Sequence, residues 1–511
     1  MNLLLRTFVL VQSVFVLTES YKILGVCPMP AHSHFTLEFR LLKALADRGH
    51  EVVSINSHPQ KEKIKNFRDV SVEEIEKPLR EFIAEIFDFP KMPYISQLLR
   101  MVDFRRVVTT HTFKNKNVQD LMKSNETFDL VIMSHFVNDA MVIFAHRFKC
   151  PLIILAPGPV TPFNNFMFVN PTPSSYVANV LTSYGSDMNF WERLDNTFKN
   201  LLAEMVVHYR YLPSQDAILK DAFPDSPPLS SIIYNASLML IVTNPSLDDP
   251  VPLQPNIKAI GGYHVLPPKP LPKDIQEFMD NSTEGVVFFS MGSNIKSSNF
   301  TLKARNAVLN AFSKIPQKVL WKYEEDLTEK PANVKIISWL PQSDILAHNN
   351  TQVFISHGGL LGTLEAIHYG VPILGVPVFW DQERNINSVV KKGFGLKLMY
   401  KDLEEKAFEK SLKEILNNPK YMENANKRSK IFHDQPMKPM DEAIFWCEYV
   451  IRHQGAPHLR SEALNLYWYQ LYSMDIVAFV LACLFAIYVV LMLFIKLTIK
   501  SNRYDDKKKN K

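Results

Sequence analysis

Apolar residues occur along this chain in short runs that alternate with amphipathic stretches. Buried strands are predicted at 21–27, 51–55, 130–133 and 152–155. Between the first two strands, residues 35–47 place apolar side chains at helical spacing, and Gly49 ends that helix. Strand, loop, helix and strand in this order predict a doubly wound α/β domain with a parallel sheet.

A proline-rich segment divides the chain. Eight prolines lie between Pro245 and Pro272, a density that disfavours regular elements. After it, a strand, a helix and a strand are predicted at 285–290, 302–315 and 319–323. We therefore expect an α/β fold of two doubly wound, Rossmann-like domains that face a cleft.

Both ends of the chain predict membrane targeting. Residues 1–20 resemble a secretory signal peptide, since their apolar run is too short to span a bilayer. Residues 476–495 form an uncharged apolar run of 20 residues, enough for one transmembrane helix. Basic residues follow it at once, so the tail should be cytosolic and the body luminal. The ending Lys508-Lys509-Asn510-Lys511 matches a dilysine retrieval signal and predicts the endoplasmic reticulum membrane; a merely basic flank is the alternative.

Charge and cysteine content limit the kinds of ligand and cross-link that the chain is expected to have. The formal net charge is +5, and residues 496–511 carry seven basic and two acidic residues, so the tail accounts for all of it. The body therefore gives no reason to expect nucleic-acid binding. Four cysteines without metal-ligand spacing predict neither a disulfide framework nor a metal site. Asn-X-Ser/Thr triplets predict glycosylation at Asn125, Asn235, Asn281, Asn299 and Asn349.

The segment 339–385 carries the strongest chemical signal. A strand at 352–356 leads through His357-Gly358-Gly359 into a helix, which gathers free backbone N–H groups and a positive helix end at one point. Glycines let a phosphate approach the backbone closely, and the histidine adds a hydrogen-bond donor. This arrangement predicts an anion site.

Other polar and aromatic residues of the segment extend that site. Glu365 can accept hydrogen bonds from two vicinal hydroxyls, as a ribose offers, and Trp339 presents a flat face to a base. Asp381 and Gln382 suit sugar hydroxyls. Anion, diol and ring sites together predict nucleotide binding.

The segment resembles the donor-binding signature of the UDP-glycosyltransferases, and the targeting signals are similar to those of the animal, insect-type, membrane-bound branch. The resemblance extends over nearly the whole chain and implies a GT-B type fold and inverting sugar transfer. The donor contacts that it implies are Trp339 on uracil, Gln342 and Glu365 on ribose, His357, Gly358, Gly359 and Ser293 on the diphosphate, and Asp381 and Gln382 on the sugar. It implies a UDP-sugar co-substrate and a small lipophilic acceptor, with no cofactor, and leaves a homo-oligomer open.

The resemblance also implies a division of the chain. The expected parts are a signal peptide (1–20), an acceptor-binding domain (21–244), a linker (245–283), a UDP-sugar-binding domain (284–440), a return helix and membrane-proximal segment (441–474), a transmembrane helix (475–495) and a basic tail (496–511).

The family implies a histidine general base near the first strand–helix turn. His34 fits the Ser-His-aromatic entry into the first helix, and His32 is the less favoured candidate. A helix N-terminus would keep that imidazole neutral. Vertebrate relatives place an orienting Asp at the position of Ser134, so we expect Asp139 to orient His34, with a helix cap as its alternative role.

Two departures bear on the donor sugar. Leu361 and Val251 stand where vertebrate relatives carry Asn and Arg, so a glucuronate carboxylate would lack a cation. An uncharged hexose, glucose first, is therefore expected on a small lipophilic hydroxyl compound. The alternatives are a catalytically degenerate binding protein and a transferase acting on lipids or proteins.

Overall fold

The computed structural model describes residues 20–79, 89–136, 138–293, 295–327 and 329–509. The chain forms two compact units, Met1–Arg460 and Ser461–Lys511. The predicted signal peptide, apart from Ser20, lies outside the described residues.

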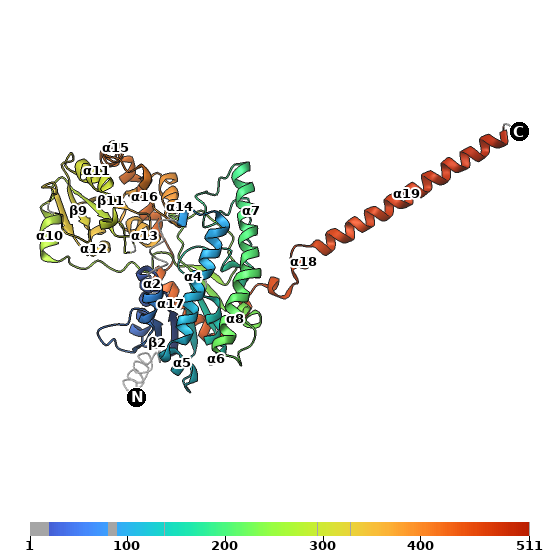
Figure 1. The fold of residues 1–511 in the computed structure, drawn as a ribbon, viewed down its shortest axis with the longest axis horizontal. Coiled ribbons are helices and arrows are strands. Elements are labelled where there is room, and N and C mark those ends of the chain that lie inside the picture. Colours follow the sequence, from blue (N-terminus) through green and yellow to red (C-terminus); the bar gives the residue numbers. More distant parts are fainter. Residues whose placement is uncertain (1–19, 80–88, 137, 294, 328, 510–511) are drawn as a thin grey trace, which may run out of the picture. The chain divides into compact units, whose positions relative to one another are not determined.

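The first domain of the larger unit is built on a parallel sheet (Figure 1). Its described strands are β1 (Lys22–Cys27), β2 (Glu51–Asn56), β3 (Phe67–Ser71), β4 (Leu130–Ser134), β5 (Leu152–Ala156), β6 (Leu238–Ile241) and β7 (Ile257–Ala259). Their order is β3-β2-β1-β4-β5-β6-β7, so the winding reverses between β1 and β4. The described α-helices in this part of the chain are α2 (His32–Asp47), α4 (Tyr94–Lys114), α5 (Lys116–Lys123), α6 (Ile143–Phe148), α7 (Phe190–Val206), α8 (Leu212–Ala222) and α9 (Leu229–Ile232).

The second domain repeats this winding. Its described strands are β8 (Val286–Ser290), β9 (Lys318–Lys322), β10 (Val334–Ile337), β11 (Thr351–Ser356), β12 (Ile373–Gly375) and β13 (Gly395–Lys397). They are parallel, in the order β10-β9-β8-β11-β12-β13, with the reversal between β8 and β11. The α-helices here are α10 (Lys273–Asp280), α11 (Leu302–Phe312), α12 (Gln342–Leu346), α13 (Leu360–Tyr369), α14 (Gln382–Lys391), α15 (Glu405–Asn417) and α16 (Lys420–His433).

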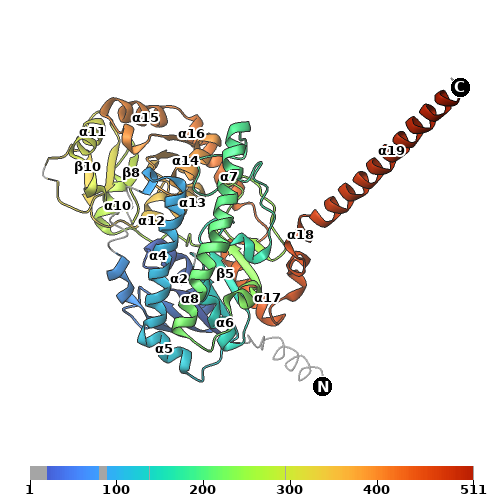
Figure 2. The same cartoon turned by 45° about the vertical axis from the view of Figure 1, so that its right-hand side comes forward.

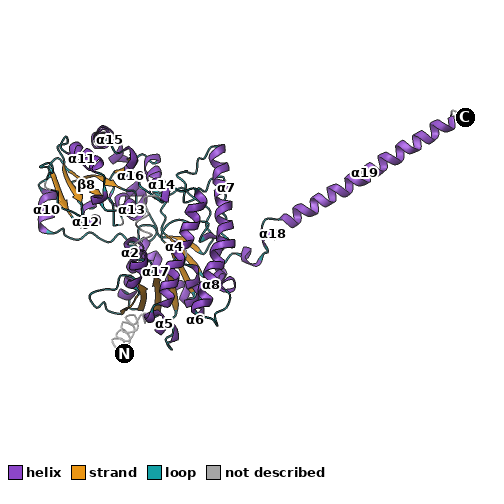
Figure 3. Ribbon diagram, viewed as in Figure 1, coloured by secondary structure: helices purple, strands orange, loops and turns teal. Residues whose placement is uncertain are grey.

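Two doubly wound domains, as predicted, are thus confirmed, and Figure 3 shows each sheet as a layer among helices. The strands β4, β5, β6 and β8 are buried on both faces because their apolar residues follow one another almost without polar gaps. In β1, Ile23 packs into the cluster that contains the apolar face of α2, while Leu24 and Val26 pack into the cluster on the other side. The carboxyl ends at each reversal point are where α/β sheets bind ligands.

The proline-rich segment contains regular structure that the sequence did not predict. Its residues Ile257–Ala259 form β7, and α10 follows it. Pro255 and Pro267 enclose a stretch without proline, and β7 lies at the edge of the sheet, where fewer backbone donors must pair.

The chain returns to the first domain after the second. The helix α17 (Pro439–Arg452) packs against α2, and Glu448 lies 2.9 Å from Arg48 Nε and 3.3 Å from His50 Nε2. The two domains are therefore tied together by more than the linker.

One long helix carries an uncovered apolar stripe. Helix α7 continues through a π-helical turn at Val207–Tyr211 into α8, and α4 runs beside both helices in Figures 1 and 2. The side chains of α7 at heptad spacing, each at least 49% exposed, are Trp191, Leu194, Phe198, Leu201 and Met205. We call these five residues the α7 stripe.

The smaller unit ends in a long apolar helix. It contains α18 (Trp468–Leu471) and α19 (Met474–Lys509). Residues Met474–Lys500 of α19 are long and apolar enough to cross a bilayer, with a mean hydropathy of 3.1 in their most apolar part. This helix contains the predicted span.

Candidate active site

His34 lies on the first turn of α2, at the carboxyl end of β1. Its ring contacts Phe136 edge-on, with 4.5 Å between the ring centroids. Nδ1 is buried and has no hydrogen-bond partner among the described residues. Burial lowers the pKa of His34 to about 4, so the imidazole is neutral at physiological pH. Burial therefore keeps the His34 imidazole neutral, rather than the helix N-terminus that the sequence suggested.

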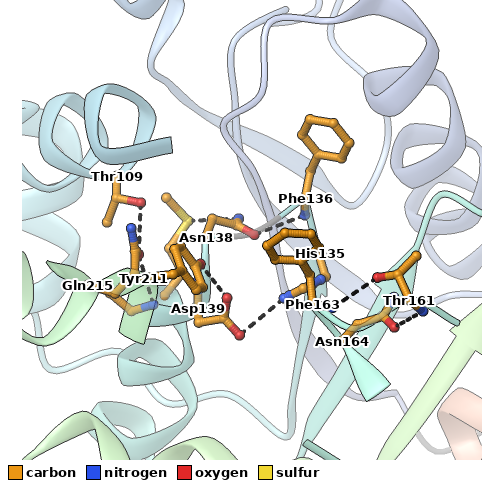
Figure 4. Close-up of polar contacts among 12 residues, drawn as sticks. Thr109, His135, Phe136, Asn138, Asp139, Thr161, Phe163, Asn164, Tyr211 and Gln215 are labelled. Carbon is orange, nitrogen blue, oxygen red and sulfur yellow. Dashed lines mark hydrogen bonds and ion pairs between the residues drawn. The ribbon is translucent and has the colours of Figure 1, made fainter. Parts of the chain in front are cut away.

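Asp139 does not form the predicted hydrogen bond with His34. It is fully buried at the start of a short 3₁₀ helix (Asp139–Val142), where Oδ1 lies 3.2 Å from His135 Nε2. Oδ2 accepts from the Tyr211 hydroxyl, and that hydroxyl oxygen in turn accepts from the Asp139 backbone N–H at 3.1 Å. Figure 4 shows this His135–Asp139–Tyr211 network, in which both carboxyl oxygens of Asp139 are engaged. Asp139 as the partner of His34 therefore stays a prediction without a contact to support it.

A buried guanidinium lies beside that network, and the sequence gave no signal for it. Arg105 on α4 is 2% exposed and stacks over Phe136 and Phe163 at 5.4 and 4.8 Å from the ring centroids. Burial lowers the pKa of Arg105 to about 9, against the opposing attraction of Tyr211 and Asp139. Its Nε and Nη1 have no partner among the described residues.

The predicted anion site is assembled from two loops of the second domain. His357 follows β11, and its ring is enclosed between Gly292, which follows β8, and Gly359: a Cβ on either glycine would lie 2.5 Å from a ring atom. Gly292 has φ of +80° and Gly358 has φ of +85°, which side chains disfavour. The predicted residues His357, Gly358 and Gly359 thus lie together at the amino end of α13, whose first N–H groups have no side-chain cap.

The charge state of this site follows from burial. Burial, with a smaller contribution from the Lys322 ammonium, lowers the pKa of His357 to about 4. The Lys322 ammonium also lies 5.7 Å from the Trp339 ring centroid. A cation and a neutral imidazole donor therefore lie near the same helix end. Ser293 is exposed on the loop after β8.

Two predicted ribose ligands contact each other. Gln342 Nε2 donates to Glu365 Oε2 at 2.6 Å. Burial raises the pKa of Glu365 to about 7, although that hydrogen bond and the Arg40 guanidinium oppose the shift. The pair can exchange its mutual hydrogen bond for those of a diol.

Trp339 leaves a free aromatic face. Its side chain is 61% exposed, unusual for so large an apolar ring. The ring of His32, on α2 of the first domain, lies edge-on to it at 5.8 Å. His32 therefore faces the predicted base-stacking residue rather than taking the place of His34.

Asp381 and Gln382 begin α14. Burial raises the pKa of Asp381, and the hydrogen bond from Asn385 Nδ2 at 2.8 Å opposes it. Gln382 Oε1 accepts from the backbone N–H groups of Val378 and Phe379, at 2.9 and 3.1 Å. The amide oxygen of Gln382 is thus used within its own loop, while its Nε2 is the group suited to a sugar hydroxyl.

An aromatic wall joins the two domains, which the sequence also missed. Trp380 stacks on Phe89 at 4.9 Å and lies 5.9 Å from Phe136, the ring that contacts His34. Trp380 has φ of +58°, a conformation that bulky residues rarely adopt. Its indole N–H is buried without a partner among the described residues. The wall suits a flat, lipophilic acceptor beside the proposed base.

The remaining predicted positions lie on the periphery. Leu361 packs against the core, and its carbonyl oxygen lies 3.3 Å from His264 Nε2. Val251 packs against the core of the first domain. The five sequon asparagines Asn125, Asn235, Asn281, Asn299 and Asn349 are all exposed.

Known proteins are similar to this chain in sequence and in fold. The family model described as UDP-glucoronosyl and UDP-glucosyl transferase matches residues 22–510. The chain is 37% identical to UDP-glycosyltransferase UGT5 of Dactylopius coccus, over 94% of this chain and 93% of that protein. It is 35% identical to UDP-glucuronosyltransferase 2B1 of Rattus norvegicus, over 91% of each.

Solved structures of glycosyltransferases have the same fold at low sequence identity. The calicheamicin glycosyltransferase CalG4 superposes with a TM-score of 0.57 at 17% identity, over 86% of this chain and all of that one. A UDP-glucose: anthocyanidin 3-O-glucosyltransferase in complex with UDP gives a TM-score of 0.55 at 17% identity, over 85% of this chain and all of that one.

Proposed function

This chain belongs to the UDP-glycosyltransferase family and is therefore a sugar-transferring enzyme, and from that premise we propose that it moves glucose from UDP-glucose to a hydroxyl of a small lipophilic acceptor, with inversion. The observation that carries the proposal is the neutral, half-buried imidazole of His34 beside an aromatic wall.

His34 acts as the general base in this proposal. The acceptor hydroxyl gives its proton to Nε2 of His34 while its oxygen attacks the anomeric carbon. The bond between that carbon and the UDP oxygen breaks, and UDP leaves. The proton later passes from Nε2 to solvent, so the step balances without a further cofactor. A pKa of about 4 keeps the base unprotonated at physiological pH.

The second domain holds the donor. Trp339 stacks on uracil, and Gln342 and Glu365 take the ribose hydroxyls. His357, Gly358 and Gly359, with Ser293 and the first turn of α13, bind the diphosphate; Asp381 and Gln382 bind the hexose. The support for this assignment is the enclosed His357 ring, the uncapped helix end and the exposed Trp339 face.

The preference for a neutral sugar rests on charge. UDP-glucuronate carries a carboxylate that must lose water on binding, and desolvating an unpaired charge costs several kcal/mol. Asp381 would repel it once ionised. The hydroxymethyl group of glucose carries no charge, so it meets neither cost.

A donor competition tests the proposal. UDP-glucose and UDP-glucuronate at equal concentration are offered with one phenolic acceptor, and the products are separated by charge. Glucoside should predominate by at least about tenfold, since each 1.36 kcal/mol is tenfold in rate. His34→Ala should lower turnover by about 10²–10⁴ while UDP still binds, and His32→Ala is the matched control. A predominance of glucuronide, or an active His34→Ala enzyme, contradicts the proposal.

We also propose that the enzyme is a single-pass type I protein of the endoplasmic reticulum, with its larger unit in the lumen and the sequon asparagines available for glycosylation. The support is the apolar helix α19, the basic residues after it and the exposure of all five asparagines.

A further inference from the structure

A second buried carboxyl group lies on the same helix as His34 and has no role in the reaction so far. Glu38 on α2 is 1% exposed. Neither of its carboxyl oxygens has a hydrogen-bond partner of normal geometry among the described residues. Buried carboxyl groups without partners are rare because leaving one unpaired is costly, so Glu38 needs an explanation.

The local packing makes room for this carboxyl group at the reversal point of the sheet. Gly25 of β1 has no side chain, and a Cβ there would lie 2.7 Å from Glu38 Oε1. Groups that interact with the carboxyl group are the Cys27 thiol and the backbone N–H groups of Ser134 and Val26. Glu38 therefore lies over β1 and the end of β4.

Helix geometry directs Glu38 toward His34. Residues four apart on a helix lie on one face, with about 5–6 Å between their Cβ atoms. Helical side chains lean toward the amino end, so that of Glu38 covers the turn occupied by His34. His34 Nδ1 and both Glu38 oxygens are buried without a hydrogen-bond partner of normal geometry among the described residues. A ring nitrogen and a carboxyl group on neighbouring turns of one helix can hydrogen-bond to each other.

The other nearby candidates are less suitable. Both oxygens of Asp139 are engaged by His135 and Tyr211. Ser134 ends β4 in the register position beside Cys27, but it supplies a hydroxyl rather than a carboxyl group. The cluster on the α2 side of the sheet contains Leu130 and Ile132, so alternation places Ser134 on that side too.

We propose that Glu38 is the positioning residue of the base. In the reacting complex its carboxyl oxygen accepts a hydrogen bond from His34 Nδ1–H, directly or across one water, which fixes the tautomer whose Nε2 lone pair faces the acceptor. This inference rests on the proposed function of His34. Glu38 keeps its own protonation state throughout: the acceptor proton enters and leaves at Nε2, and Nδ1 keeps its hydrogen.

The surroundings of Glu38 make it an acceptor rather than a counter-charge. Burial raises its pKa well above the usual range, and the other titratable groups that face it are Cys27 and Tyr263. No cation among the described residues is recorded as interacting with it. Since a neutral carboxyl still offers a carbonyl oxygen, a glutamine should replace it well.

Steady-state kinetics on the full-length enzyme test this. Glu38→Leu should lower kcat about 100-fold with KM for UDP-glucose within about twofold, because a wrong tautomer affects the chemical step and not donor binding. Glu38→Gln should keep kcat within about fivefold. Adding Ser134→Asp to Glu38→Leu should recover at least about tenfold, because it returns a carboxyl group to the same space. Lys43→Ala, on the exposed face of α2, is the control for general disturbance of the helix.

The outcomes separate this inference from the proposed function. If His34→Ala is inactive while Glu38→Leu keeps kcat within about threefold, Glu38 has no positioning role and only this inference fails. The same holds if Glu38→Gln is as slow as Glu38→Leu, if Ser134→Asp recovers nothing, or if Asp139→Asn alone lowers kcat at constant KM. An active His34→Ala enzyme instead removes the proposed base. If Glu38→Leu does not fold, the kcat values of Glu38→Gln and of the double variant Glu38→Leu/Ser134→Asp test the positioning role.

Discussion

At the scale of single residues, burial sets the charge of the groups proposed to touch substrate. It lowers the pKa of His34 and of His357 to about 4 and raises that of Glu365 to about 7. The two imidazoles are thus neutral at physiological pH, while the carboxyl group of Glu365 is close to half-ionised. Ribose hydroxyls are donors, so they bind best to the ionised form.

Donor affinity should therefore depend on pH. The folded pKa of Glu365 is raised, so the carboxylate that binds ribose is lost as pH falls through about 7. UDP-glucose, which does not titrate in this range, should bind about tenfold more tightly at pH 8 than at pH 6. Isothermal titration across this range measures the effect, and Glu365→Gln should give weaker binding that does not change with pH. A wild-type profile as flat as that of the variant contradicts the assignment.

Sequence reasoning found the residues of this site that lie in one continuous motif. His357, Gly358 and Gly359 could be found because strand, glycine turn and helix are contiguous. The proposed role of Glu38 depends on Gly25 and Ser134, which lie on other elements, and one partner of Asp139, Tyr211, comes from the π-helical turn before α8. Such pairings depend on how helices pack over a sheet, which periodicity does not encode.

At the scale of elements, the anion site depends on two loops that approach unusually closely. Gly292 after β8 has φ of +80°, and a Cβ there would lie 2.5 Å from the His357 ring. Short apolar runs predicted β1, β2, β4, β5, β8, β9 and β11, while the sequence analysis predicted none of the described strands β3, β6, β7, β10, β12 and β13. β7 was missed because its three residues lie between prolines.

Gly292→Ala should therefore weaken donor binding as well as stability. The added Cβ strains the backbone and displaces His357, which should lower UDP affinity by about tenfold or more at a stability cost of about 1–3 kcal/mol. Calorimetry for UDP and thermal unfolding measure the two effects. Gly158→Ala, whose Cβ would meet only Leu360 at 4.0 Å, is the matched control. Unchanged UDP affinity in Gly292→Ala would show that the two loops do not form the anion site.

At the scale of the whole molecule, the two domains repeat one winding order. Each domain therefore places its proposed substrate-binding histidine after a strand at the point where the strand order reverses. Both sheets reverse between their first and fourth strands in chain order, and His34 and His357 follow strands at those points. The sequence predicted this repetition from the second strand–helix–strand pattern alone.

The proposed topology has a direct test. Protease added to sealed microsomes should remove only a short peptide after α19, because the basic tail is the part expected on the cytosolic side. Immunoblots with antibodies to each end of the chain measure the size of the protected fragment, and detergent-opened vesicles are the control. Digestion of the larger unit in intact vesicles contradicts the luminal orientation.

The α7 stripe has a practical consequence for anyone who purifies this enzyme. Trimming the chain before Met474 removes the membrane helix but leaves five large apolar side chains in contact with water. The trimmed protein should still self-associate or require detergent on size-exclusion chromatography, and Leu194→Glu with Leu201→Lys should make it monodisperse without loss of UDP affinity. A trimmed wild-type chain that is already monodisperse without detergent would contradict this. Crystallisation of the catalytic unit therefore calls for a change in surface chemistry as well as a shorter chain.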